Sequence, residues 1–238
     1  MNRAQLVAVI VGALLVPAAA VPVALGAWNP LTTNLVEGID VSAHQGPIDW
    51  DAVTRGDVRF AYMKATEGSD FVDPRFAFNW RGAERAGIAR GAYHYFTLCR
   101  SGAQQAANFI RTVPRSASAL PPAVDLEHMG PCLHGPTATH VDEEITRFLD
   151  IVEAHYGVRP ILYTTREFHD AHLSALPRER WWIRSLYTPP EFRRGEWVIW
   201  QHHNGAHRAG ISEPVDLDAF RGDEAALRAL TRRAEPST

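Results

Sequence analysis

The stretch Pro121-Pro-Ala-Val-Asp125-Leu-Glu127 places two acidic residues, one residue apart, inside an otherwise apolar run. Prolines precede this run and a Gly130-Pro-Cys132 loop follows it, which are typical boundaries of a short strand. Successive side chains of a strand point to opposite faces, so we expect Asp125 and Glu127 to share one face. Neighbouring carboxyl groups on a buried strand have separated pKa values, as acid catalysis requires. The alternative is a pair on a solvated edge, since other acidic pairs with this spacing occur in the chain.

Short apolar strands alternate with helices on both sides of this stretch. The expected strands are Glu37–Val41, Val58–Lys64, Ala89–Phe96, Ala123–Glu127, Arg159–Tyr163, Trp181–Arg184, Trp197–Gln201 and Val215–Phe220. The expected helices run from Asp73 to about Ala86, from Ser101 to about Thr112, over Thr139–Tyr156 and from Glu224. This alternation predicts a parallel sheet, and eight strands predict closure into a barrel. Because the late part is poor in helices, the predicted fold is α/β, an irregular TIM-like β/α barrel with eight strands and fewer than eight helices.

The ends of the chain differ in composition from the part between them. The 238 residues, of which 46% are hydrophobic, allow one packed domain, predicted over residues 36–230 and followed by a frayed tail over residues 231–238. Residues 1–28 carry a charge at Arg3 and then none, which indicates either a cleaved secretory signal or a retained membrane anchor. Residues 29–35 form a linker. Both alternatives predict an exported protein that is secreted, periplasmic or attached to the membrane by its N-terminal segment.

Charge and cysteine content narrow the possible partners and chemistry. The formal net charge is -3 and no cluster of Lys or Arg stands out, so we expect no nucleic-acid partner. Cys99 follows the strand Ala89–Phe96, and Cys132 follows the strand Ala123–Glu127. Loops after neighbouring parallel strands lie side by side, so an exported chain is expected to join these cysteines in a disulfide. Such a bond would stabilise the fold by about 3–4 kcal/mol in the loop-entropy model.

Acidic residues recur at the ends of the predicted strands, where barrels of this kind carry their reactive side chains. Asp40 ends the first strand, and Asp125 and Glu127 end the fourth. Asp216 lies in the eighth strand, which would close against the first. Each residue alone is also typical of a helix cap or a turn. Together they predict four carboxylates, from three strands, that face one mouth of the barrel.

Seven stretches of the chain resemble glycoside hydrolase family 25, the Chalaropsis-type lysozymes. They are Gly38-Ile-Asp40-Val-Ser42-Ala-His-Gln45-Gly46, Tyr62-Met-Lys64-Ala-Thr66-Glu67-Gly68, Gly91-Ala-Tyr93-His94-Tyr95-Phe96, Ala123-Val-Asp125-Leu-Glu127, Ile161-Leu-Tyr163-Thr164, Ile199-Trp200-Gln201 and Val215-Asp216-Leu217-Asp218. They follow the order of the family and cover the chain from about Glu37 to Phe220.

The resemblance implies a lysozyme, an N-acetylmuramidase that hydrolyses the β-1,4 bond between N-acetylmuramic acid and N-acetylglucosamine in the glycan strands of peptidoglycan. It implies that Glu127 is the acid/base and that Asp125 is its partner at the reacting sugar. Asp40 and Asp216 match the other acidic positions of the cleft, and Tyr93, Tyr163 and Gln201 match positions near the sugar. We expect no metal, no cofactor and a monomer. Asp125 would either orient the acetamido group of the sugar, whose oxygen attacks, or act beside an enzyme nucleophile.

The chain departs from the family pattern at two positions. Asp218 stands where many members carry Asn, and Arg184 follows Trp181-Trp182-Ile183 where a small residue is commoner. We expect neither residue to touch the four acidic residues, and either one to be able to change contacts with the substrate.

Two other functions are compatible with parts of the sequence. A zinc-dependent peptidoglycan amidase would need histidine ligands, and His169-Asp-Ala-His172 and His202-His203 come closest to ligand spacing, although neither is a strong zinc signature. A catalytically inactive wall-binding module on the same fold is the other alternative. Retention of all four carboxylates argues against an inactive module.

Overall fold

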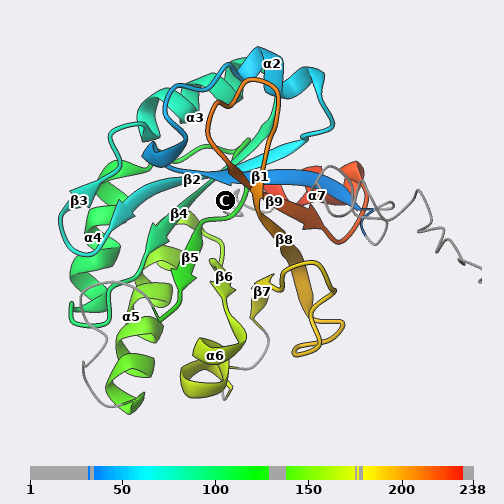
Figure 1. Cartoon of the computed structure of the whole chain (residues 1–238). Coiled ribbons are helices and arrows are strands. Elements are labelled where there is room, and N and C mark those ends of the chain that lie inside the picture. The colour runs from blue at the N-terminus through cyan, green and yellow to red at the C-terminus, as the bar shows by residue number, and fades with distance from the viewer. Residues whose placement is uncertain (1–31, 33–34, 129–137, 175, 177–178, 233–238) are drawn as a thin grey trace, which may run out of the picture.

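The computed structural model describes residues 32, 35–128, 138–174, 176 and 179–232. Eight strands form a closed barrel (Figure 1): β1 (Val36–Val41), β2 (Phe60–Glu67), β4 (Ala89–Tyr95), β5 (Ala123–Leu126), β6 (Ile161–Thr164), β7 (Arg180–Arg184), β8 (Trp197–Ala206) and β9 (Val215–Phe220). They pair in chain order, and β1 closes the barrel by pairing with both β2 and β9. The short strand β3 (Phe71–Val72) extends the end of β2 as a hairpin. The predicted eight-stranded irregular barrel is therefore confirmed.

The prediction of a wholly parallel sheet is wrong for the last strand. Strands β1 to β8 pair in parallel around the barrel, but β9 is antiparallel to both β8 and β1. Residues 207–214 connect β8 to β9, and this segment is too short for the crossover that a parallel pair needs. As a result β9 begins at the rim where the parallel strands end, and Asp216 lies opposite Asp40.

Side chains of the strands alternate between the inside of the barrel and the surrounding helices. In β2, Phe60 and Tyr62 belong to the inner apolar cluster, whereas Ala61 and Met63 belong to the outer one. Strand β5 follows the same rule, with Ala123 inside and its two apolar neighbours Val124 and Leu126 outside. This period of two residues places the side chain of the intervening residue, Asp125, on the inner face.

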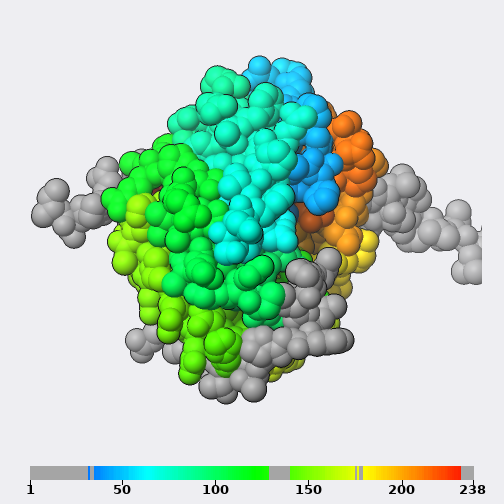
Figure 2. All heavy atoms as spheres, turned by 90° about the vertical axis from the view of Figure 1, so that its left-hand side faces the viewer, coloured from blue at the N-terminus to red at the C-terminus, as the bar shows by residue number. Residues whose placement is uncertain are grey.

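Six α-helices occur in the described part of the chain: α2 (Trp50–Arg55), α3 (Phe76–Arg85), α4 (Gly102–Thr112), α5 (Ala138–Tyr156), α6 (Arg166–Phe168) and α7 (Glu224–Arg232). The four predicted helices correspond to α3, α4, α5 and α7, and the Ser101 side chain caps α4 as expected. Helix α4 packs against α5 and β2, and the segments from α3 to α5 gather on one outer face of the molecule (Figure 2). Helices α2 and α6 were not predicted, because each has six residues or fewer.

Four predictions fall wholly or partly outside the described residues: the N-terminal segment, the linker over residues 29–35, the tail over residues 231–238 and the disulfide. Residues 1–28, predicted as a signal or an anchor, lie outside the described residues, as does Cys132. Both the nature of the N-terminal segment and the disulfide stay predictions. Among the described helices, none has the length and apolar character needed to cross a membrane.

Candidate active site

A cavity of about 220 Å³ opens at the rim of the barrel where the parallel strands end. All seven residues predicted for the site line it: Asp40, Tyr93, Asp125, Glu127, Tyr163, Gln201 and Asp216. Ser42, His44, Gln45, Lys64, Tyr95 and Trp182 line it as well. Each of the eight barrel strands supplies at least one lining side chain, so the closure of the barrel assembles the site.

Asp125 on β5 and Glu127 directly after it both line the cavity, but their carboxyl groups have different surroundings. Burial raises the pKa of Asp125, and the negative charges of Glu127 and Asp40 raise it further. Its Oδ1 atom is buried and has no hydrogen-bond partner in the described part of the chain. Glu127 follows the end of β5 and is partly buried. Burial raises its pKa, and the positive charges of Arg184 and Lys64 partly offset this rise. The site therefore holds two adjacent carboxyl groups whose pKa values are both raised.

A glutamine connects the two remaining acids on the opposite wall. The Gln201 amide nitrogen donates to Asp40 Oδ2 at 2.7 Å and to Asp216 Oδ2 at 3.2 Å. The Tyr163 hydroxyl donates to Gln201 Oε1 at 3.0 Å. Gln201 is buried, so its amide serves the two carboxyl groups and the phenol within the protein. The resemblance assigned Gln201 and Tyr163 to the sugar, and the structure adds this bonding between them.

The acids on this wall also have raised pKa values. Burial raises the pKa of Asp216 to about 6, with Glu127 adding to the shift and Arg184 opposing it. Burial and then the Asp216 charge raise the pKa of Asp40, whereas the hydrogen bond from Gln201 lowers it. Burial and the surrounding carboxylates raise the pKa of Tyr93, so its phenol remains a proton donor. The cavity thus concentrates acidic groups whose charges depend on one another.

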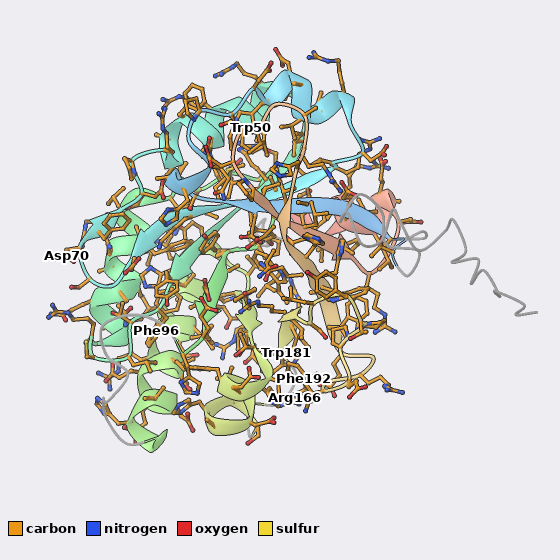
Figure 3. The ribbon with its side chains drawn as sticks, viewed as in Figure 1. Trp50, Asp70, Phe96, Arg166, Trp181 and Phe192 are labelled. Carbon is orange, nitrogen blue, oxygen red and sulfur yellow. The ribbon has the colours of Figure 1, made fainter. Side chains whose placement is uncertain are left out.

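A tryptophan that the sequence analysis did not single out forms a central part of the site. The Trp182 ring lies 5.0 Å from the Tyr62 ring, 6.5 Å from Tyr93 and 5.1 Å from Tyr163, measured between ring centres. Trp181 instead faces outward, and lies near Phe192 and Arg166 on that side of the barrel (Figure 3). Strand alternation was the signal for Trp182, because it lies on the same face of β7 as Arg184.

Lys64 is a second lining residue that was not predicted for the site. Its side chain points inward from β2, two residues after Tyr62. Its Nζ atom lies 2.6 Å from Glu67 Oε2 and 4.8 Å from the centre of the Tyr95 ring. The lysine charge lowers the pKa values of Asp125 and Glu127, and so limits the rise caused by burial.

The histidines considered as zinc ligands lie away from this cavity. His169 accepts a hydrogen bond from Arg193 and packs 5.4 Å from the Trp181 ring, on the outside of the barrel. His202 is buried 5.4 Å from the Trp200 ring, and burial lowers its pKa to about 4. Within the residues that the structure describes, no group of three or more His, Cys, Asp or Glu has an arrangement suited to a metal ion.

The fold and the site together define a class of enzyme. Cleavage of a glycosidic bond needs a proton on the leaving oxygen and negative charge near the reacting carbon. The cavity supplies several carboxyl groups, whose raised pKa values favour a protonated donor among them, and aromatic rings line it. These features define a barrel enzyme that hydrolyses glycosidic bonds.

Comparison with known proteins gives the family. The chain belongs to family 25 of the glycosyl hydrolases, whose family model matches residues 39–211. The "Uncharacterized protein YegX" of Escherichia coli (strain K12) is 35% identical over 202 residues, which cover 82% of this chain and 73% of the relative. Lysozyme M1 of Streptomyces globisporus is 33% identical over 217 residues, which cover 85% of this chain and 73% of the relative. A family 25 glycosyl hydrolase from Bacillus anthracis shares the fold with a TM-score of 0.78 and 35% identity, over 82% of this chain and 93% of that one.

Proposed function

We propose that the protein is a lysozyme that hydrolyses the β-1,4 bond between N-acetylmuramic acid and N-acetylglucosamine in peptidoglycan. The observation that carries the proposal is the pair Asp125 and Glu127, which line one cavity and both have raised pKa values. The family assignment supports it, as does the 33% identity to a protein named Lysozyme M1.

In this proposal Glu127 is the general acid and then the general base. Its raised pKa keeps a larger fraction protonated near neutral pH than an ordinary glutamate would have. In the first step Glu127 gives its proton to the leaving glycosidic oxygen as the bond to the sugar carbon breaks. In the second step the ionised Glu127 takes a proton from water, whose oxygen bonds to the same carbon.

Asp125 orients the acetamido group of the muramic acid. Its buried Oδ1 has no donor among the described residues, and buried acceptors are normally paired, so an acetamido N–H from the substrate would complete it. The acetamido oxygen then bonds to the sugar carbon as the leaving group departs, and the Asp125 charge stabilises the positive charge on the resulting ring. Water later breaks that bond and restores the acetamido group.

Asp40 and Asp216 supply negative charge from the opposite wall, where Gln201 holds both. Their charge favours the oxocarbenium-like transition state over the neutral sugar, which is the condition for a lower barrier. Tyr93, with its phenol protonated, is available as a donor to a sugar hydroxyl in the same cavity.

The bond that is cut can be identified directly by mass spectrometry of digested peptidoglycan. New reducing ends that carry N-acetylmuramic acid are expected. N-acetylglucosamine at those ends, or release of stem peptides alone, would contradict the proposed bond. Binding without any cleavage would support an inactive wall-binding module. Loss of activity on EDTA treatment and its return with zinc would favour the amidase.

Two variants test the roles of the carboxyl groups. Glu127→Gln should fold normally and lose about a hundred- to ten-thousand-fold in rate; near-normal activity would place the acid elsewhere. Asp125→Asn should cost much of the rate on acetylated glycan and far less on glycan whose muramic acid is de-N-acetylated. The wild type and Asp125→Asn are each measured on both substrates, and the four rates are compared as a cycle. An equal loss of rate on the two substrates would show that Asp125 acts independently of the acetamido group.

We also infer that the protein acts outside the cytoplasm, because peptidoglycan is there and residues 1–28 have the composition of a signal or an anchor. N-terminal sequencing of the mature protein, with fractionation of cells into membrane and soluble parts, distinguishes cleavage from anchoring. A full-length protein in the cytoplasmic fraction would contradict export.

A further inference from the structure

Asp218 is an acid that the proposed reaction does not use. It lies on β9, two residues after Asp216, and its side chain has no exposed surface. Its partner across the β1–β9 pair is Gly38, two residues before Asp40. By strand alternation Asp218 points into the barrel, one layer below the cavity.

The contacts of its two carboxyl oxygens are different. Oδ1 accepts a hydrogen bond from the Trp182 indole N–H at 2.8 Å. Oδ2 is buried, and no N–H or O–H donor reaches it among the residues that the structure describes. Each of the Asp218 and Asp40 carboxyl groups shifts the pKa of the other, so Asp218 does act on the acidic set, contrary to expectation.

Two carboxyl groups form a hydrogen bond only when one of them carries a proton, because an ionised carboxylate has no donor. Asp40 already accepts the Gln201 amide N–H at 2.7 Å, which suits an anion. A proton on Oδ2 of Asp218 satisfies all the atoms: Oδ1 accepts from Trp182 and the Oδ2 hydroxyl donates to Asp40. An ionised Asp218 would leave a buried charge beside two other acids.

We propose that Asp218 is a positioning residue that stays protonated at neutral pH and donates a hydrogen bond from Oδ2 to the Asp40 carboxylate. This bond fixes the Asp40 carboxylate against Gln201 and keeps its charge at the wall of the cavity. The consequence for catalysis rests on the proposed function, in which Asp40 acts as an anion; the protonation state does not depend on it.

The electrostatic surroundings agree with this assignment. Burial is the largest cause of the raised pKa of Asp218, followed by the Asp40 charge, and the Trp182 bond opposes the rise. The titratable groups that interact electrostatically with Asp218 come from three strands: Asp40 on β1, Tyr62 on β2 and Asp216 on β9.

Two substitutions of Asp218 and one control separate the effect of the proton from that of the rest of the side chain. Asp218→Asn keeps an acceptor for Trp182 and a donor for Asp40 but cannot ionise. Asp218→Leu removes the acceptor and the donor together. Asp57→Asn is the control, because the Asp57 side chain is 94% exposed.

The first measurement is urea unfolding between pH 5 and 8. A buried acid whose folded pKa lies above its unfolded value of about 3.9 contributes its full stability below that value and loses it as the pH rises toward the folded pKa. The unfolding constant of the wild type, relative to Asp218→Asn, should therefore increase about tenfold per pH unit. Asp57→Asn should show a constant ratio. A constant ratio for Asp218→Asn as well would mean that Asp218 is ionised in the folded protein, and would overturn the proposal.

The second measurement is the rate of glycan cleavage. Asp218→Asn should stay within about threefold of the wild-type kcat, whereas Asp218→Leu should lose about ten- to a hundredfold in kcat with little change in KM, as expected for one hydrogen bond to a charged group. Equal activity of the two folded variants would refute the positioning role.

If Asp218→Leu does not fold, infrared difference spectra of the wild type and Asp218→Asn at pH 7 test the protonation of Asp218 instead. A protonated carboxyl band absent from the variant supports the proposal, and no difference overturns it. If no glycan is cleaved, the unfolding and infrared results still stand, so a wrong function and a wrong proton assignment remain distinguishable.

Discussion

Replacing Gln201 with leucine tests whether the wall opposite Glu127 depends on a neutral amide. Leucine is similar in size but removes three hydrogen bonds: those to Asp40, to Asp216 and from Tyr163. A net hydrogen bond contributes about 0.5–1.5 kcal/mol between neutral groups and about 1.5–3 kcal/mol to a charged one. The 2.7 Å bond to Asp40 should dominate, and the Tyr163 hydroxyl would lose its buried acceptor. We therefore expect a loss of about 3–4 kcal/mol in the free energy of unfolding at pH 7.

The loss should depend on pH in a defined direction. The Gln201 amide lowers the pKa of Asp40, so it stabilises the ionised form. The bond matters less once Asp40 is protonated, and the difference between Gln201→Leu and the wild type should shrink from pH 7 to pH 4. Urea unfolding at both values measures this. The exposed Gln104 on α4 provides the control variant Gln104→Leu, expected to change stability by about 0.5 kcal/mol or less at either pH. A loss below about 1 kcal/mol that is equal at both pH values would refute the role given to Gln201.

Three further predictions concern charge, a buried histidine and the cysteines. Arg184→Gln should raise the pKa values of Glu127 and Asp216, since the guanidinium lowers both; Glu127 would keep its proton to higher pH, so the alkaline limb of the kcat/KM profile should move upward, and an unmoved limb would contradict this. His94→Phe should cost about 1–3 kcal/mol at pH 7 in urea unfolding, because the buried Thr66 and Gln105 side chains lose their partner. Burial lowers the pKa of His94 to about 3, so its contribution to the free energy of unfolding is complete above the unfolded pKa of about 6.5 and is lost as the pH falls toward 3. A stability difference between His94→Phe and the wild type that grows as the pH falls would contradict this. Native oxidised protein should show no titratable thiols at Cys99 and Cys132, and two reactive thiols would exclude the predicted disulfide.

The inner face of the barrel was predictable because it follows from a period of two residues. Asp40, Asp125 and Tyr163 lie near the ends of apolar strands, and parallel strands bring such ends to one rim. Both the two-residue period and the position of a residue at a strand end can be read from the local sequence pattern. The expectation that these residues line one cavity therefore holds in the structure.

Features that depend on distant contacts were not predictable in the same way. The direction of β9 follows from the short connection after β8, and the expected strand alternation carried no information about it. The burial of Asp218 and its bond to Trp182 join residues 36 positions apart. The bridge from Gln201 to Asp40 spans 161 positions. Each of these depends on which strands become neighbours, and this is decided only when the barrel closes.

That closure also sets the order in which the molecule can acquire its activity. Asp216 is carried by β9, which follows the other barrel strands in the chain, and its place opposite Asp40 exists only after β9 has inserted between β1 and β8. Pairings between such distant segments are intrinsically slow to form. A nascent or incompletely folded chain can already hold Asp125 on β5 and Glu127 directly after it, yet its cleft lacks the opposite wall. In the proposed reaction, which uses Asp40 and Asp216, we therefore expect hydrolysis to begin only once β9 has docked.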